Sequence, residues 1–208
     1  MKRAKALRVL ARLDKEYGEP SLGKGDAFHL LVATILSAQC TDARVDKVMP
    51  ALFARFKTPA DFSRANASEL EKLVRSTGYY RQKARHLKGA AKAIVEKHGG
   101  LVPRSMSELV ALPGVGRKTA NIVLSLAFQR VEGVAVDTHV WRLSRRLGFT
   151  LRNTQAGIER DLMALFPRGK WWALNELLVE HGRRVCVARK PRCGKCVVRA
   201  LCPSRESN

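Results

Sequence analysis

Residues 112–121 read LPGVGRKTAN, with an apolar helical pattern on either side of the segment. One proline and two glycines within five residues are typical of a tight turn. Gly114 and Gly116 let backbone N–H groups approach a ligand closely, and the next helix starts immediately afterwards. Free amides at a helix N-terminus form an anion site, which would suit a phosphate. The alternative interpretation is an ordinary corner between two helices.

The helix after this turn carries one candidate nucleophile. Its apolar stripe is formed by Ala120, Val123, Leu124, Ala127 and Phe128. Lys118 lies roughly 180° from that stripe, in the first helical turn. Most lysines in such positions are solvated surface charges. The positive end of a helix disfavours an ammonium, however, and a neutral amine is the form that a nucleophile needs.

Asp137 is the second candidate for chemistry. It follows the short apolar segment of residues 134–136 and precedes a helix that is expected to begin near Thr138. Aspartate is a preferred N-cap residue, so a purely structural role is the alternative. The two roles are compatible, because a capping carboxylate that faces a cleft could also hold or deprotonate an amine.

Four cysteines lie close together near the C-terminus with the spacing C-x6-C-x2-C-x5-C: Cys186, Cys193, Cys196 and Cys202. Structural disulfides are disfavoured because nothing marks the chain as secreted. Zinc ribbons usually use paired C-x-x-C knuckles, and only Cys193 and Cys196 form one here. An iron–sulfur cluster tolerates unequal spacers, so the spacing favours it modestly.

The charge of the chain indicates a polyanionic partner. Lysine and arginine number 39 against 18 acidic residues, a formal charge of +21. No acidic residue occurs between Gly182 and Arg205, a segment that contains seven cations: Arg183, Arg184, Arg189, Lys190, Arg192, Lys195 and Arg199. Nucleic acid is therefore the first partner to consider and an anionic membrane the second, while a merely well-solvated surface is the alternative.

The sequence gives no sign of a membrane span or a signal peptide. No apolar run reaches the length of about 18 residues that a spanning helix needs. The N-terminus lacks an apolar signal core and instead repeats Ala6, Val9, Leu10 and Leu13 at helical spacing. We therefore expect a cytoplasmic protein, whose reducing surroundings suit metal-bound thiolates.

Almost the whole chain shows helical patterns, and strand signals are weak. Residues 28–40 are apolar on nearly all sides, as in a buried central helix that includes Cys40 as a core residue. A helix is expected to start at Thr58-Pro59, and capping boxes are expected at Ser68 with Glu71 and at Ser105 with Glu108. The sequence predicts an all-α fold with the four-cysteine segment appended.

Five motifs occur together: residues 36–39 (LSAQ), 112–121, 136–139 (VDTH), 188–193 (ARKPRC) and the four-cysteine pattern. In that combination, across about residues 20–202, the chain closely resembles the endonuclease III family. These proteins are bifunctional DNA glycosylases with a helix-hairpin-helix motif.

The resemblance implies a two-lobed helix-hairpin-helix DNA glycosylase fold. A six-helix barrel would span residues 22–132, with the helix-hairpin-helix motif at about residues 104–128. The second lobe would combine residues 1–21 with residues 133–208. It would hold a [4Fe–4S] cluster on the four cysteines of the loop 186–202, and the active-site cleft would lie between the lobes.

The resemblance also implies the reaction, which belongs to base-excision DNA repair. Such an enzyme removes oxidised pyrimidines from duplex DNA as an N-glycosylase, and as an AP lyase it cleaves the strand 3′ to the abasic site. Lys118 would attack C1′ of the sugar and form a Schiff base, and Asp137 would activate Lys118 and stabilise positive charge on the sugar. β-Elimination would then break the strand. The target base must first leave the stack, because C1′ is inaccessible inside the duplex.

Further positions are implied to contact damaged double-stranded DNA. Gln39 matches the residue that fills the gap left by the flipped base. Tyr79 stands at the intercalating wedge, where the family commonly presents an aliphatic residue, and this departure leaves lesion preference open. The other expected DNA contacts come from the turn, from the histidine of the VDTH segment and from a basic loop. These residues are Gly114, Val115, Gly116, Arg117, His139, Arg189, Lys190 and Arg192. A monomer in the cytoplasm, associated with the nucleoid, is expected.

Three other functions compete with this one. A mismatch adenine glycosylase typically lacks a lysine at the position of Lys118 and carries an extra C-terminal domain, so Lys118 and the end of the chain at Asn208 argue against it. A DNA-binding paralogue with weak or no activity is the second, and Tyr79 leaves room for it. A zinc-stabilised scaffold is the third, and it would be colourless where an iron–sulfur protein is brown.

Overall fold

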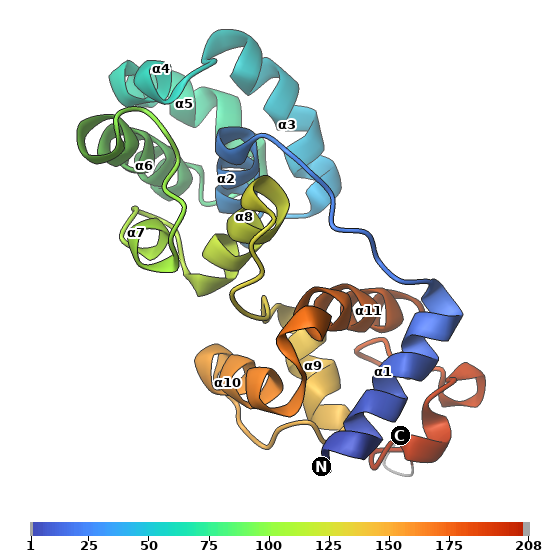
Figure 1. Cartoon of the computed structure of the whole chain (residues 1–208). Helices are drawn as coiled ribbons and strands as arrows, with labels where there is room; N and C mark the ends of the chain where they lie inside the picture. Colours follow the sequence, from blue (N-terminus) through green and yellow to red (C-terminus); the bar gives the residue numbers. More distant parts are fainter. Residues whose placement is uncertain (1, 206–208) are drawn as a thin grey trace. The chain divides into compact units, whose positions relative to one another are not determined.

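The computed structural model describes residues 2–205, and among these residues it contains helices, turns and loops but no strand (Figure 1). The all-α prediction is confirmed. The chain forms two compact units. We call residues Gly23–Arg130 the central unit, and the described residues up to Leu22 together with those from Val131 the terminal unit.

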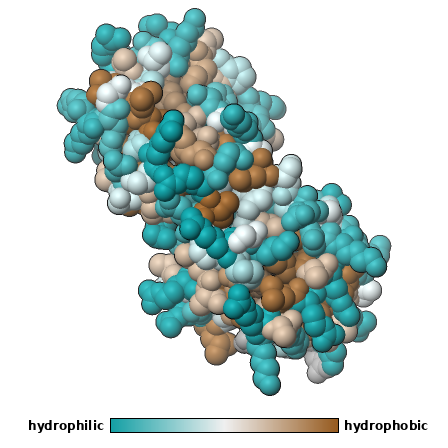
Figure 2. Space-filling view, in the orientation of Figure 1, coloured by the Kyte–Doolittle hydropathy of each residue, from teal (hydrophilic) through white to brown (hydrophobic). Residues whose placement is uncertain are grey.

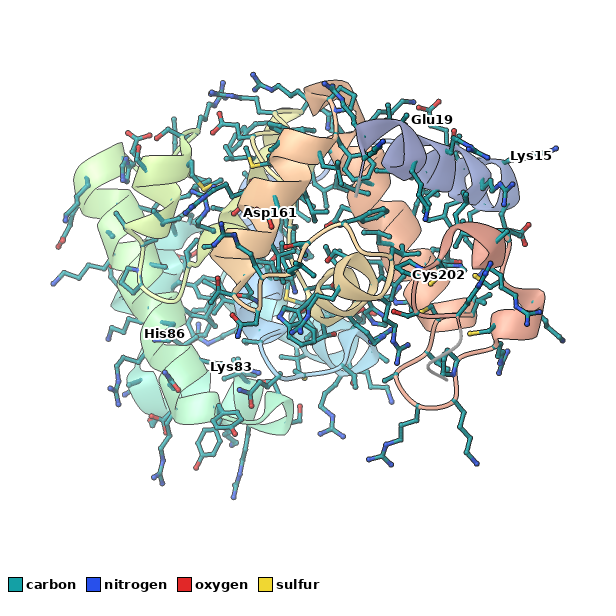
Figure 3. All side chains as sticks on the ribbon, turned by 90° about the horizontal axis from the view of Figure 1, so that it is seen from below. Lys15, Glu19, Lys83, His86, Asp161 and Cys202 are labelled. Atoms are coloured by element: carbon teal, nitrogen blue, oxygen red, sulfur yellow. The ribbon has the colours of Figure 1, made fainter. Side chains whose placement is uncertain are left out.

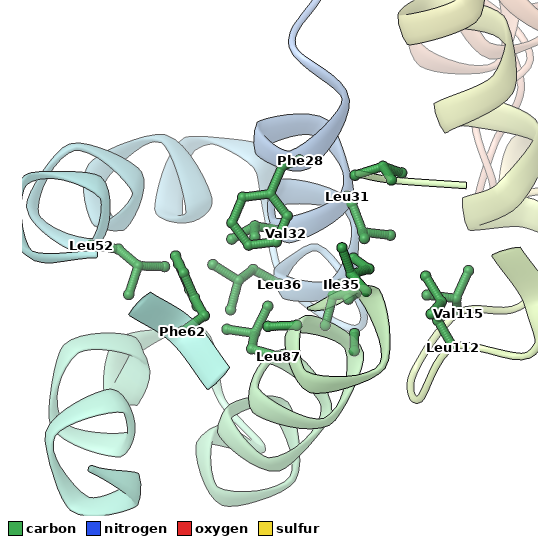
Figure 4. Close-up of a cluster of buried hydrophobic side chains, with 14 of the residues drawn as sticks. Phe28, Leu31, Val32, Ile35, Leu36, Leu52, Phe62, Leu87, Leu112 and Val115 are labelled. Carbon is green, nitrogen blue, oxygen red and sulfur yellow. The ribbon is translucent and has the colours of Figure 1, made fainter. Parts of the chain in front are cut away.

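The central unit is built around one buried helix. Its elements are α2 (Ala27–Leu36), α3 (Asp42–Arg55), α4 (Pro59–Arg64), α5 (Ala67–Val74), the 3₁₀ helix η1 (Arg75–Thr77), α6 (Tyr80–His98), α7 (Met106–Val110) and α8 (Arg117–Phe128). Helix α2 packs against α3, α6 and α8. Figure 4 shows Val32 and Leu36 of α2 pointing toward Leu52, Phe62 and Leu87 of the neighbouring helices, and all five side chains are buried. Burial on nearly all sides explains the almost continuous apolar sequence of α2.

Helix α2 ends four residues earlier than the sequence predicts. It stops at Leu36, and the Ser37 hydroxyl donates a hydrogen bond to the Ala33 carbonyl at 2.9 Å. Gln39 then takes a left-handed backbone conformation with φ 51°, which turns the chain away. A serine that bonds a carbonyl one turn back, followed by a left-handed residue, opposes continuation of a helix. Cys40 lies in this turn, half-buried against the central core.

The N-cap residues determine where α4, α5 and α7 begin. Helix α4 begins at Pro59, as predicted, and Thr58 and Asp61 form a capping box at its start. The box predicted at Ser68 is wrong, because Asn66 caps α5 instead and its side chain accepts a hydrogen bond from the Ser68 amide. Asparagine ranks with serine among the strongest N-caps and comes first in the chain here, so the helix begins two residues earlier. The box predicted at Ser105 forms only in part. The Ser105 hydroxyl caps α7 by accepting from the Glu108 amide, but it also donates to the Glu108 carboxylate, which takes the place of the bond to the Ser105 amide.

The terminal unit has its own core. Its elements are α1 (Arg3–Tyr17), α9 (Thr138–Arg146), α10 (Gln155–Leu165), η2 (Arg168–Lys170), α11 (Trp171–Arg184), η3 (Cys193–Lys195) and η4 (Arg199–Leu201). Helix α1 buries the predicted stripe of Ala6, Val9, Leu10 and Leu13, and it packs against α11. Helix α11 also packs against α9, and the side chains of these helices form one hydrophobic cluster with those of η4.

The surface is largely polar. Figure 2 shows hydrophilic residues over much of the visible face of each unit. Within residues 2–205, no helix combines the length and the apolar character that crossing a membrane requires.

The turn between α7 and α8 is packed tightly against α6. Gly114 has φ 78°, and a Cβ placed on it would lie 2.7 Å from the Cβ of His86. Leu112 and Val115 bury their side chains in the central core on either side of Gly114 (Figure 4). The tight turn predicted from the sequence is therefore present, and its first glycine is required by both backbone conformation and space.

Gly114→Ala is expected to lower the free energy of unfolding by about 1–3 kcal/mol, because it combines a left-handed alanine with a steric clash. Gly116 is the matched control, since its φ is −94° and no atom lies within 4 Å of a Cβ placed on it. Chemical denaturation of the two variants measures the difference. Equal stability of Gly114→Ala and Gly116→Ala would contradict this description of the turn.

Candidate functional site

Lys118 lies in the first turn of α8, directly after the turn. Its side chain is exposed and makes no hydrogen bond or ion pair within residues 23–130. The N-cap residue is Gly116, which has no side chain to cap the helix. The positive end of the helix dipole at this position favours an anion. The central unit thus presents an accessible primary amine beside an open anion site.

Asp137 caps α9, so its structural role is present. Its Oδ1 accepts a hydrogen bond from the Val140 amide at 2.7 Å, and the residue is half-buried. The buried segment Val134–Val136 leads into it. No described residue of the terminal unit bonds Oδ2, so one carboxylate oxygen remains available for chemistry.

Gln39 and Tyr79 are exposed residues of the central unit with unusual backbone conformations. Their φ angles are 51° and 47°, and Tyr79 has an exposed fraction of 64%. A left-handed conformation is uncommon for residues other than glycine and concentrates at functional sites. Both positions therefore have a shape suited to presenting a side chain to a ligand.

The four cysteines Cys186, Cys193, Cys196 and Cys202 line one cavity of the terminal unit. No three histidine, cysteine or acidic side chains among residues 2–205 are grouped as the ligands of a single metal ion. Four cysteine side chains around one cavity fit the donor set of an iron–sulfur cluster, which is held by four thiolates.

Two arginines of α9 hold the first part of the cysteine segment. Arg142 donates to the Cys186 and Gly182 carbonyls at 3.1 Å, and Arg146 donates to the Val187 and Ala188 carbonyls at 2.8 and 2.9 Å. Arg146 Nη1 also lies 3.5 Å from Cys186 Sγ. Neither residue was predicted from the sequence. Because they are four residues apart on a predicted helix, the sequence could have indicated that they lie on the same face of it.

Burial shapes the chemistry of the thiols. It raises the pKa of Cys196 and of Cys202, and the neighbouring cysteines raise both further. A thiolate at these positions therefore needs a cationic partner, which cluster iron supplies when it is bound.

His181 of α11 connects this cavity to α1. It is buried, with Nδ1 lying 2.8 Å from the Tyr17 hydroxyl and Nε2 lying 3.4 Å from Cys196 Sγ. Burial lowers the pKa of His181 to about 4, so the ring is neutral near pH 7. When Cys196 is a thiolate that holds the cluster, its sulfur can only accept, so Nε2–H donates to sulfur and the Tyr17 hydroxyl donates to Nδ1. A single histidine in a helix gave no sequence signal for this role.

His181→Leu is expected to weaken cluster retention by about 10- to 100-fold, the usual effect of removing a residue that orients a metal ligand. Iron content per chain and visible absorbance after dialysis against a chelator measure the loss. His98→Leu in the central unit serves as the control. Equal iron retention by the two variants would rule out the role assigned to His181.

The basic loop and His139 have distinct surroundings. Arg189, Lys190 and Arg192 are exposed, and Lys190 has φ 52°. The Arg192 amide donates to the Val185 carbonyl at 2.9 Å, which fixes the base of this loop. His139 is half-buried with Nδ1 lying 3.2 Å from Arg142 Nη2, so it packs inside the terminal unit. DNA contacts by these four residues stay predictions.

Comparison with known proteins identifies the family. Residues 32–168 match the HhH-GPD superfamily of base excision DNA repair proteins, and residues 186–202 match the iron–sulfur binding domain of endonuclease III. Endonuclease III of Synechocystis sp. is 49% identical over 209 residues, which cover 100% of this chain and 95% of that protein. The chain belongs to the endonuclease III family. Endonuclease III of Escherichia coli K12 is 37% identical over 208 residues, which cover 99% and 98% of the two chains.

Solved structures agree with this assignment to the endonuclease III family. A trapped covalent intermediate of an endonuclease III with DNA superposes with a TM-score of 0.92 at 39% identity, covering 100% of this chain and 98% of that one. A thermostable thymine-DNA glycosylase superposes with a TM-score of 0.85 at 26% identity, covering 99% and 97%. The predicted helix-hairpin-helix glycosylase fold is thereby confirmed.

The cofactor follows from the family. The iron–sulfur match begins at Cys186 and ends at Cys202, the first and last cysteines of the cavity. The cofactor of this chain is a [4Fe–4S] cluster, and the four cysteines are its proposed ligands. Lys118 and Asp137 belong to different units, and their meeting in one active site stays a prediction.

Proposed function

We propose that this chain removes oxidised pyrimidines from duplex DNA and then cleaves the strand at the abasic site, with Lys118 as the nucleophile. The observation that carries this proposal is the exposed amine of Lys118 in the first turn of α8, directly after the Gly116 N-cap. The position of Lys118 matches the family motif, and a protein of this family forms a covalent intermediate with DNA.

The proposed chemistry assigns one step to each group. Lys118 Nζ bonds to C1′ as the glycosidic bond breaks and the base leaves. Asp137 accepts the proton that the attacking amine loses and stabilises positive charge on the sugar. The amine–sugar adduct becomes a Schiff base as the C1′–O4′ bond breaks and O4′ takes a proton. Loss of a C2′ proton then breaks the C3′–O bond and expels the 3′ phosphate. Water hydrolyses the imine and releases Lys118.

The DNA-contact residues have separate proposed tasks. The amides at the turn and the basic loop hold phosphates on the two units, since phosphate contacts fix the register of a protein on DNA. Gln39 and Tyr79 enter the stack and fill the space that the flipped base leaves, which offsets the cost of flipping. One chain supplies all of these groups. We therefore also propose that it acts as a monomer, on nucleoid DNA in the cytoplasm.

A duplex with one thymine glycol tests the proposed function when base release and strand breakage are measured separately. We expect base release and strand breakage on the damaged duplex without alkali treatment. We expect neither reaction on the undamaged duplex. Breakage of an abasic duplex alone would mean a lyase whose pocket, with Tyr79 at the wedge, rejects that lesion. Binding without either reaction would favour a non-catalytic DNA-binding protein.

A further inference from the structure

Lys83 is a buried lysine that connects two separate turns of the central unit. It lies in the first turn of α6 (Figure 3). Only 3% of its surface is exposed. Its Nζ donates to the Leu36 carbonyl and to the Thr77 carbonyl, each at 2.7 Å. A lysine is almost never buried without such partners.

Both acceptors are helix ends. Leu36 is the last residue of α2 and Thr77 is the last residue of η1. Terminal carbonyls have no partner within their own helix and carry the negative end of the helix dipole. One amine therefore caps two helices whose ends lie 41 residues apart in the sequence. Burial lowers the pKa of Lys83, and the nearby Cys40 thiol opposes that shift.

Each capped helix leads directly into an exposed left-handed residue. Gln39 follows Leu36 by three residues, and Tyr79 follows Thr77 by two. Their φ angles are 51° and 47°. Left-handed residues other than glycine persist only where the surrounding structure fixes them. The Lys83 bridge is placed to fix both, because it holds the backbone from which each turn departs.

We infer that Lys83 is a positioning residue that holds the Gln39 turn and the Tyr79 turn at a fixed separation, so that both side chains enter the duplex as one unit. The inference rests on the proposed function, in which Gln39 fills the gap and Tyr79 is the wedge. Lys83 does not touch the reacting atoms. It acts by setting the distance between the two groups that replace the flipped base.

Lys83→Met tests this inference, since methionine keeps the length of the side chain and removes the donor. Single-turnover excision of thymine glycol from duplex DNA is expected to fall about 10- to 100-fold, because small misplacement of positioning groups has effects of that size. Borohydride trapping on a single-stranded abasic oligonucleotide is expected to stay within about twofold, because that substrate needs no base flipping. Equal losses on the two substrates would overturn the inference.

Lys88 provides a matched control on the same helix. Its Nζ donates to the Ala65 carbonyl at 2.8 Å, so it makes the same kind of bond without reaching either turn. Lys88→Met is expected to match the wild type on both substrates. If Lys83→Met and Lys88→Met excise the duplex lesion at the same rate, Lys83 has no positioning role. A wild-type protein that neither excises the duplex lesion nor is trapped on the abasic oligonucleotide would refute the proposed function itself.

A second measurement applies even if Lys83→Met does not fold. Gln39→Ala and Tyr79→Ala are compared singly and together, with an intact Lys83, in the duplex excision assay. Two side chains that work as one unit give non-additive effects, so the double variant is expected to lose little more than the worse single variant. If the double variant instead loses activity by the product of the two single-variant losses, the two turns are not coupled and the inference is overturned.

Discussion

Lys118→Gln is expected to lower strand cleavage at an abasic site by about 10³-fold or more, because it removes the amine that forms the covalent intermediate. Lys118 is exposed and lies opposite the buried stripe of α8, so the fold does not depend on it. Duplex binding is therefore expected to change only severalfold. Gel-resolved single-turnover kinetics measure cleavage, and fluorescence anisotropy measures binding.

Lys97→Gln is the control for this result. Lys97 is an exposed lysine in the last turn of α6, so its replacement removes one positive charge without touching α8. It is expected to keep wild-type cleavage. Residual cleavage by Lys118→Gln within tenfold of the wild type would assign the nucleophile to another amine.

Asp137→Asn is expected to lower the rate of base excision by about 10²- to 10⁴-fold while α9 keeps its cap, since asparagine caps as well as aspartate. Asp137→Ala is expected to lose the same activity and, in addition, about 0.5–2 kcal/mol of folding stability, because the bond to the Val140 amide disappears. Comparing excision rates with denaturation midpoints separates the carboxylate's chemistry from its structural role.

Asp26 offers the matched control for the aspartate. It caps α2 and accepts a hydrogen bond from the His29 amide at 2.7 Å. Asp26→Asn keeps the same kind of cap and removes the same charge, so it is expected to excise at the wild-type rate. If Asp137→Asn also excises at that rate, the aspartate is a cap and nothing more.

The local features of the fold could be predicted because they depend on neighbouring residues. The apolar spacing of α1, the helix start at Thr58-Pro59 and the turn at Gly114 each involve residues within a few positions of one another. The wrong predictions concern helix ends, where neighbouring residues could each have ended or capped the helix. The apolar spacing does not indicate which of them does so. Ser37 and Gln39 ended α2 early, and Asn66 replaced Ser68 as a cap because it came first.

The residues that the sequence analysis missed act through distant partners. Lys83 bonds a carbonyl 47 positions away, Arg142 bonds one 44 positions away, and His181 contacts a tyrosine 164 positions away. Only the folded chain brings such groups together, so neither periodicity nor spacing indicates them. Lys118, Asp137 and the four cysteines were proposed from motifs, whereas the groups that hold the cysteines in place came from the structure.

Mapping the covalent adduct tests the central claim most directly. The cluster-containing protein is treated with borohydride on duplexes that carry one thymine glycol or one abasic site, and the adduct is digested and located by mass spectrometry. The account predicts that both DNAs attach to the peptide that contains Lys118, at the Lys118 side chain. Attachment to another amine, or tight binding of both DNAs without any adduct, would contradict it.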